Sequence, residues 1–455
     1  FVLNRYIENV VAFTAQELSG RFGLAPGDAE AKIAAWEAEG RIERPPFAEP
    51  GSGYWSSRRV VARIVRLSLA TVRSAEGPVP PERWQRLLLA RHGIGTGGDE
   101  RLPAAGGAEA LKRAIAPLQG LFLPASLWES AVFPARVPAY RREDLDLLCA
   151  SGELTWLGRR GDGEREGRIA FFLTEGDGET LRDGVLTFGA DESWGTLADG
   201  AGGGTARSNA APRGGETAHP ELLEALRSRG AVFLTRLSAD LGEPPSVLLS
   251  KLMDLVWEGR AANDQFAPVR NYLLAGGKLH PKLGSGHGRW YAVEPPARTP
   301  ELDQVRALAW AKHLLRSFGA VTGYLTDLYA PFGWDAALPL LKQLEDWGYV
   351  ARGLFIAGIP ALQFMDRETI AALRSRPETS SAAKTEAGSA AAKPASPASR
   401  PALVSALDPA VPYGAVIPWP DVPGVEFARK AGNYLVFVNG IWTYWIGANG
   451  KHIAR

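Results

Sequence analysis

The feature that most constrains the fold of this 455-residue chain is a phrase that occurs four times. In each copy, a helix with one apolar face ends at a glycine before a β-prone residue, and a shorter helical segment precedes it. The copies lie at Ile33–Ile42, Leu145–Leu154, Val247–Leu274 and Leu341–Val350. Short helix, turn, longer helix and strand pair is the order of a winged helix-turn-helix. Irregular spacing between the copies predicts an array of winged helices and no solenoid.

Val247–Leu274 is the longest copy and shows the pattern most clearly. Pro244 and Pro245 stand where a helix begins, apolar residues follow at helical spacing, and Gly259 ends the helix. After it we expect a turn and an extended arm. The alternative is a small three-helix unit used only for packing, because winged helices also serve as protein-contact modules.

The predicted fold class is mainly α with α+β: tandem winged-helix domains followed by a small C-terminal β-barrel. The barrel is expected from short strands, Gly414–Pro418 and Val425–Ala428 among them, and Asn439-Gly440 is typical of a hairpin turn. The predicted boundaries are winged helix 1 at 1–53, a helical connector with an arginine-rich helix at 54–120, winged helix 2 with strands at 121–190, a flexible linker at 191–216, winged helix 3 at 217–295, winged helix 4 at 296–375, a disordered linker at 376–401 and the barrel at 402–455.

The ends of the sequence suggest a fragment of a longer protein. The chain starts at Phe1 without an initiator methionine, and Asn449-Gly450 begins a turn just before the chain stops, so we expect a truncated barrel. The sequence shows no signal peptide and no apolar run long enough to span a membrane. We therefore expect no membrane partner and a cytoplasmic location.

Charge and motif content exclude several kinds of site. The chain has 51 basic and 50 acidic residues, so nucleic-acid binding must depend on local patches and not on net charge. Cys149 is the single cysteine, which excludes an internal disulfide and a thiolate zinc site. The sequence contains no G-x-x-x-x-G-K-[ST] loop, H-E-x-x-H motif or G-x-S-x-G elbow. No metal site is predicted, and His280 and His287 are expected to face solvent.

Two groups of residues are candidates for DNA binding. Tyr54–Ser74 is predicted to be a helix capped by Ser56 or Ser57, and its arginines lie close together opposite an apolar face. Planar, permanently charged guanidinium groups suit phosphate oxygens, although the same face could be solvated and paired with carboxylates. The candidates in this helix are Arg59, Arg63, Arg66 and Arg73, and those in the longest copy are Ser250, Lys251, Arg260 and Arg270.

Asp408 is the candidate catalytic residue. It follows a strand and precedes Pro409, so we expect it at the barrel mouth, where a carboxylate could point into a groove and assist N-glycosidic cleavage. The alternative is an Asp-Pro turn that caps its own backbone. Asp264 has the same ambiguity and is expected to form a turn at a wing, and Gln363 and Asp366 are weaker candidates.

Several stretches resemble the C-terminal half of the large helicase-related (Lhr) family of bacterial superfamily 2 DNA helicases. They are LMDLVWEGRAANDQFAPVRNYLL, GRWYAV, LQGLFLPASLWESAVFPARV, LDLLCASGELTW and VSALDPAVPYGAVIPWP. The resemblance implies a DNA-repair helicase whose C-terminal winged helices end in a β-barrel. ATP and Mg²⁺ would then be needed only by a helicase core upstream. Some family members are associated with uracil-DNA glycosylase activity and oligomerisation, and the family's D-P motif falls on Asp408-Pro409.

Two functions follow as hypotheses. In the first, the chain is the DNA-binding region of such a helicase, with possible base excision, and its partner is single-stranded DNA or a duplex with a single-stranded tail near the bacterial nucleoid. In the second, it is a homo-oligomeric assembly scaffold without catalysis that positions DNA for the motor. A transcription regulator fits less well, because such proteins rarely combine several dissimilar winged units with a barrel.

Overall fold

The computed structural model describes residues 2–49, 51–64, 67, 77–95, 107–161, 163–164, 166–174, 217–276, 288–293, 299–375 and 401–455. Several predictions concern residues outside this set: the linker at 191–216, the linker at 376–401 except for its last residue, Arg66, Arg73, His280 and His287. Among the helices described, none offers an apolar stretch long enough to cross a bilayer.

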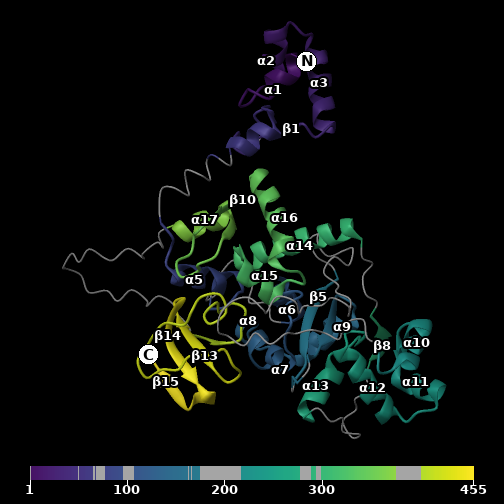
Figure 1. Ribbon diagram of the computed structural model, residues 1–455. Helices are drawn as coiled ribbons and strands as arrows, with labels where there is room; N and C mark the ends of the chain where they lie inside the picture. The colour runs from purple at the N-terminus through teal and green to yellow at the C-terminus, as the bar shows by residue number, and fades with distance from the viewer. Residues whose placement is uncertain are drawn as a thin grey trace, which may run out of the picture.

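The N-terminal unit is a winged helix with a hydrophobic core of its own. It consists of α1 (Val2–Ile7), α2 (Ala15–Phe22), α3 (Pro26–Ala38), β1 (Ile42–Glu43) and β2 (Ser56–Ser57). Thr14 and Glu17 form a capping box that satisfies backbone N–H groups at the start of α2. Phe13 and Trp36 belong to a buried cluster separate from that of the body. The unit accordingly stands above the body in Figure 1.

Three further winged helices form most of the body, and their sheets share one strand order. In each, a short strand ahead of the second helix pairs with the last strand, which gives the orders β3-β5-β4, β6-β8-β7 and β9-β11-β10. An isolated bridge between Phe13 and Trp55 extends the same arrangement to the N-terminal unit. The prediction of tandem winged helices is confirmed.

The elements of the body follow in chain order after α5 (Pro81–Arg91). The second winged helix comprises α6 (Ala108–Ile115), η1 (Ala116–Leu118), β3 (Leu123–Pro124), α7 (Ala125–Leu127), η2 (Trp128–Val132), α8 (Phe133–Arg136), α9 (Arg142–Ala150), β4 (Leu154–Arg159) and β5 (Arg168–Leu173). The third comprises α10 (Pro220–Arg229), β6 (Val232–Phe233), α11 (Leu234–Leu241), α12 (Pro245–Trp257), β7 (Ala261–Asn263), α13 (Ala267–Leu274) and β8 (Arg289–Ala292). The fourth comprises α14 (Pro300–Phe318), β9 (Val321–Thr322), α15 (Gly323–Tyr329), α16 (Trp334–Asp346), β10 (Val350–Gly353), β11 (Gln363–Asp366) and α17 (Arg367–Arg374).

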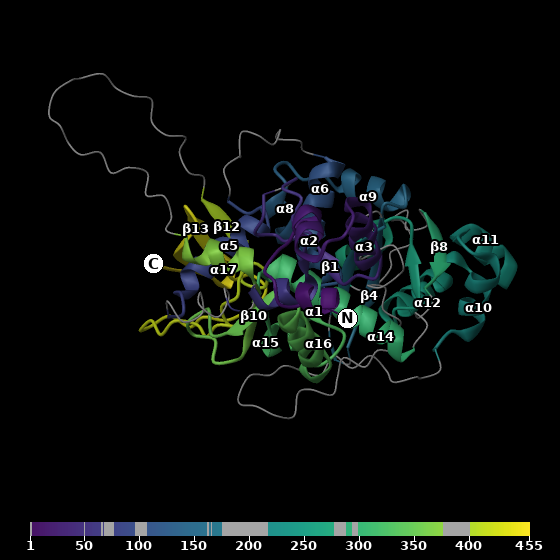
Figure 2. The same ribbon diagram turned by 90° about the horizontal axis from the view of Figure 1, so that it is seen from above.

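The C-terminal module is an antiparallel sheet in the order β12-β13-β14-β15. Its elements are β12 (Ala402–Ser405), β13 (Tyr434–Val438), β14 (Ile441–Gly447), η3 (Ala448–Gly450) and β15 (His452–Ala454). Within residues 401–455 the sheet is open, and the expected strands at Gly414–Pro418 and Val425–Ala428 are irregular segments. The predicted barrel is therefore not confirmed. Both ribbon views place this sheet and α10 at opposite ends of the body (Figure 1, Figure 2).

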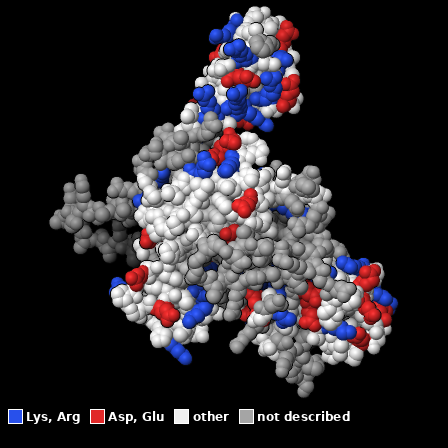
Figure 3. All heavy atoms as spheres, viewed as in Figure 1, with Lys and Arg blue, Asp and Glu red and all other residues white. Residues whose placement is uncertain are grey.

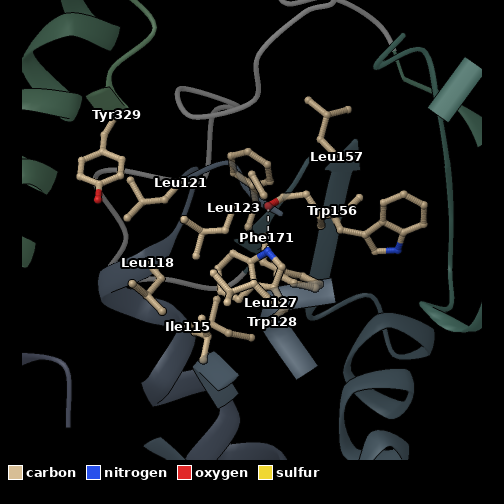
Figure 4. Close-up of a cluster of buried hydrophobic side chains, with 14 of the residues drawn as sticks. Ile115, Leu118, Leu121, Leu123, Leu127, Trp128, Trp156, Leu157, Phe171 and Tyr329 are labelled. Atoms are coloured by element: carbon tan, nitrogen blue, oxygen red, sulfur yellow. Dashed lines mark hydrogen bonds between the residues drawn. The ribbon is translucent and has the colours of Figure 1, made fainter. Parts of the chain in front are cut away.

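The core of the body is continuous across its units. Figure 4 shows part of it, where Leu118, Leu121 and Leu127 converge on Trp128 and Phe171. Trp128 donates its indole N–H to the Ile169 carbonyl at 2.9 Å, so the ring is buried without an unsatisfied donor. Replacing such a ring by alanine costs about 3–5 kcal/mol.

Two local predictions differ from the structure. The expected extended arm after Gly259 is instead β7 followed by the helix α13. The Asp146 carboxylate on α9 accepts the N–H of Phe266, the residue before α13, at 3.1 Å and ties the start of this helix to the second winged helix. The predicted boundary at residue 121 also lies too late, since α6 packs against α9 and β5 of the second winged helix. Both differences come from contacts between residues far apart in sequence.

Candidate nucleic-acid interface

The candidate residues of the third winged helix are mostly engaged within the protein. Lys251 lies 2.6 Å from a Glu243 carboxylate oxygen, and Arg260 lies 3.9 Å from one of Glu258. Ser250 is exposed on α12. The exposed residues in the first two turns of this helix, Pro245, Ser246, Val247 and Ser250, are all uncharged.

Arg270 links the third winged helix to the second. Its guanidinium lies 2.8 Å from Glu129 and 2.9 Å from Asp146, and its side chain is nearly buried. Burial lowers the pKa of Arg270, but the hydrogen bonds to Glu129 and Asp146 outweigh that effect and raise the pKa overall. The predicted phosphate contact of Arg270 conflicts with this position, because both faces of the charge are already neutralised.

The longest helix of the N-terminal unit does not present a basic face either. On α3, Asp28, Glu30 and Glu37 are exposed, whereas Lys32 is half-buried over the Trp36 ring. Phosphate groups would be repelled by this surface. We therefore do not expect α3 to lie in the major groove of DNA, where a recognition helix usually binds.

The arginine-rich helix that begins at residue 58 is different. Ser57 accepts the Val60 N–H and caps the helix, in agreement with the sequence prediction. Arg59 and Arg63 are exposed, and the part of the chain that the structure describes supplies no hydrogen-bond or ion-pair partner for either. The neighbouring Arg58, by contrast, lies 3.4 Å from Glu43. Arg66 and Arg73 lie outside the described residues.

These arginines line a groove of about 1460 Å³ between the N-terminal unit and the fourth winged helix, which we call the junction groove. One wall is formed by the helix at 58–63, and the other by α14, by the end of α16 and by β10. Figure 3 shows basic and acidic side chains together where the two parts meet. The charged lining residues are Arg58, Arg59, Arg63, Arg91, Lys312, Arg316, Glu43, Asp346, Asp366 and Glu368.

Two of the charged residues that line the junction groove, Arg91 and Asp366, stabilise helix ends. Arg91 donates to the carbonyls of Leu315 (2.7 Å) and Arg316 (2.9 Å) at the end of α14, and burial lowers its pKa. Asp366 accepts the Thr369 N–H and caps α17. Arg59, Arg63 and Lys312 remain as exposed cations, and the described residues provide no partner for Lys312. The groove therefore offers positive charge on both walls.

Asp408 does not face a groove. It is fully buried, and its two carboxylate oxygens each accept a hydrogen bond of 2.7 Å from Arg136 of α8. Burial raises the pKa of Asp408, but the Arg136 guanidinium outweighs it and holds the pKa below its usual value. The carboxylate also accepts the Ala410 N–H at 2.9 Å. The predicted position at an open mouth is wrong, and the alternative of a turn that caps its own backbone describes the geometry.

The weaker candidates also occupy structural positions. Asp264 pairs with Arg289 at 2.6 Å in the wing of the third winged helix. Gln363 is buried and accepts the N–H groups of Phe355 and Ile356. Cys149 is buried, and no cluster of three potential metal ligands occurs among the described residues.

Sequence reasoning missed Lys312 and the aromatic side chains of the junction groove. Trp347 and Tyr349 line it and are 51% and 67% exposed. Their spacing around Gly348 predicts a helix end and gives no sign of a binding surface. Only the approach of two units far apart in sequence brings them opposite Arg59 and Arg63.

Two stretches of the chain match models of one protein family. A family model described as "Large helicase-related protein, winged-helix domain" matches residues 79–174, and a second with the same description matches 300–385. The chain is 29% identical over 481 residues to "Lhr helicase/ probable uracil glycosylase" of Mycolicibacterium smegmatis, and 28% identical over 485 residues to "Lhr helicase/uracil glycosylase" of Escherichia coli. These alignments cover 99% and 98% of this chain but 29% of each relative.

Proposed function

The chain belongs to the large helicase-related (Lhr) family, as a C-terminal region of it, and on this premise we propose that it is the DNA-binding region of a longer DNA-repair helicase. The observation that supports this proposal most strongly is the junction groove with its exposed cations. The sequence has no phosphate-binding loop, so we assign ATP and Mg²⁺ to other parts of the longer protein.

Arg59 and Arg63 are suited to successive phosphates. Residues four apart on a helix lie on one face, about 6 Å apart. Since neither guanidinium has a carboxylate partner within the described residues, a phosphate would displace only water and counterions. Each such contact releases condensed counterions and makes affinity depend on salt.

The test compares two double variants of the full chain. In Arg59→Ala/Arg63→Ala both groove arginines are removed, and the matched control is Arg5→Ala/Arg21→Ala in the same unit, outside the groove lining. Fluorescence anisotropy with a labelled oligonucleotide that has a single-stranded tail gives affinity at several salt concentrations. We expect the groove variant to bind about tenfold more weakly, with a salt slope smaller by about 1.5. Equal effects in the two variants would refute the assignment.

An alternative function, a homo-oligomeric scaffold, is favoured by one face of the C-terminal sheet. Leu403, Tyr444 and Ile453 share that face by register and are 53%, 37% and 70% exposed. Light scattering over a range of protein concentrations, with and without DNA, separates the two functions. Growth in size together with no DNA affinity would support the scaffold and contradict the DNA-binding proposal.

Uracil excision is a finer proposal that the names of the relatives support. Asp408 could take part only if its pair with Arg136 opened, because it is enclosed. Uracil-containing single-stranded oligonucleotide, treated with alkali to cut abasic sites, measures the activity. Asp408→Asn and Arg136→Gln both break the pair, but only the first removes the carboxylate. Loss confined to Asp408→Asn would assign the chemistry to Asp408, and equal loss would assign the pair a structural role.

A further inference from the structure

We propose that the junction groove binds single-stranded nucleic acid, with an unstacked base held by Trp347 and Tyr349. This inference depends on the DNA-binding function proposed above and adds the place where a single strand would lie and the residues that would hold its bases. Nonspecific single-strand sites combine cations that follow the backbone with aromatic rings on which bases stack. The junction groove contains both.

The two aromatic side chains are exposed, whereas most of the tryptophans that the structure describes are buried. Trp36, Trp84, Trp128, Trp156, Trp290 and Trp310 are among its largest fully buried side chains. Trp347 and Tyr349 are more than half exposed and touch one another, with ring centroids 6.5 Å apart. Their exposure has no packing benefit, whereas an exposed flat ring in a charged groove can stack on a base.

The backbone fixes the position of both rings. Trp347 is the C-cap residue that follows α16, and Gly348 has φ +80°, a conformation that only glycine adopts easily. The N–H groups of Gly348 and Tyr349 bond to the carbonyls of Glu345 and Leu344, both at 2.9 Å. The rings therefore belong to a rigid helix end and not to a free loop. Their planes meet at 82°, so they form a corner that can hold the face of one base and the edge of the same base.

The charge distribution favours one strand over two. Arg59 and Arg63 lie on one wall and Lys312 on the other, which suits a single backbone running between them. Asp346 and Glu368 also line the groove, and a second phosphate backbone would have to approach these carboxylates. Duplex bases are also stacked on one another, so the aromatic corner could not reach their faces. The volume of about 1460 Å³ exceeds that of a usual small-ligand pocket and suits several nucleotides.

The experiment measures the affinity of the full chain for a labelled 12-nucleotide oligo-dT, for the same length of duplex, and for a strand of abasic nucleotides. The variants are Trp347→Ala, Trp347→Phe and Tyr349→Ala, and Tyr324→Ala is the control because Tyr324 is exposed in the same winged helix outside the groove lining. We expect Trp347→Ala to weaken oligo-dT binding about tenfold, and Trp347→Phe to restore most of the loss. Binding of the abasic strand should change less than twofold, since it has no base to stack.

The outcomes separate this inference from the function on which it depends. If Trp347→Ala binds oligo-dT like the unmodified chain while Arg59→Ala/Arg63→Ala binds more weakly, the aromatic corner is excluded and DNA binding by the groove remains. Tighter binding of duplex than of single strand would also overturn the inference. If the unmodified chain binds none of the three ligands, both proposals fail.

Discussion

The basic residues of the third winged helix and those of the arginine-rich helix look alike in the sequence but have different roles in the structure. Lys251 and Arg270 are paired with carboxylates, and Arg270 lies between two packed units. Arg59 and Arg63 lie at the junction of the N-terminal unit with the body and have no partner among the described residues. A basic residue is therefore available to a ligand only where the fold leaves it uncompensated.

The reason for the difference is the extent of each hydrophobic core. The second and third winged helices share one core, so a charge between them must be neutralised or it would lose its hydration without compensation. The N-terminal unit has a separate core and needs no such pairing at its surface. The contrast leads to three tests, all of which concern charges or histidines inside the body.

The largest effect should come from Asp408→Asn, at the most buried pair. Removing one partner leaves the Arg136 charge enclosed and uncompensated, which costs about 3–5 kcal/mol. Urea unfolding of the full chain, followed by tryptophan fluorescence, measures the change in the free energy of unfolding. Arg59→Ala serves as the control and should change it by less than about 0.5 kcal/mol. An equally small change in both variants would show that the buried Arg136–Asp408 pair contributes little to the free energy of unfolding.

Arg270→Ala should have the next largest effect. It leaves Glu129 and Asp146 facing one another without a cation, and we expect a loss of about 2–3 kcal/mol in the free energy of unfolding. Affinity for a tailed oligonucleotide should stay within twofold of the unmodified chain. If affinity fell tenfold while stability was retained, Arg270 would bind DNA as we propose for Arg59 and Arg63. The contrast between paired and available basic residues would then be wrong.

The sequence predicts local features well and distant contacts poorly. The hairpin at Asn439-Gly440 is confirmed. Its turn requires positive φ at both positions, here 54° and 74°, and asparagine and glycine adopt positive φ more readily than other residues, so the signal is local. The contact that ties the start of the helix α13 to the second winged helix comes from Asp146, 120 residues away, and local sequence gives no sign of it. The enclosure of Asp408 depends on Arg136, 272 residues away. Lys312 and Trp347 line a groove only because α14 and the end of α16 lie opposite the arginine-rich helix.

The smallest expected effect concerns pH and two buried histidines of the body, His92 and His313. Burial lowers the pKa of His92 to about 3 and that of His313 to about 4. Charges also act on these rings: Arg136 lowers and Asp408 raises the pKa of His92, and Arg316 lowers that of His313. Below pH 6.5 the unfolded chain binds protons that the folded chain does not, so stability is lost as the pH falls from there towards the folded values.

Between pH 7 and pH 5.5 this linkage should remove about 1 kcal/mol per histidine from the free energy of unfolding. His92→Gln should reduce the pH dependence by about half over this range, as measured by urea unfolding at each pH. The Asp408 carboxyl does not contribute there, because its lowered pKa keeps it ionised in the folded state. Affinity for DNA, which we assign to arginines and a lysine, should change little over the same range. A parallel fall in affinity and stability would show that DNA binding by the groove depends on the buried histidines and their charged neighbours. The distinction between charges paired inside the body and charges available to a ligand would then be wrong.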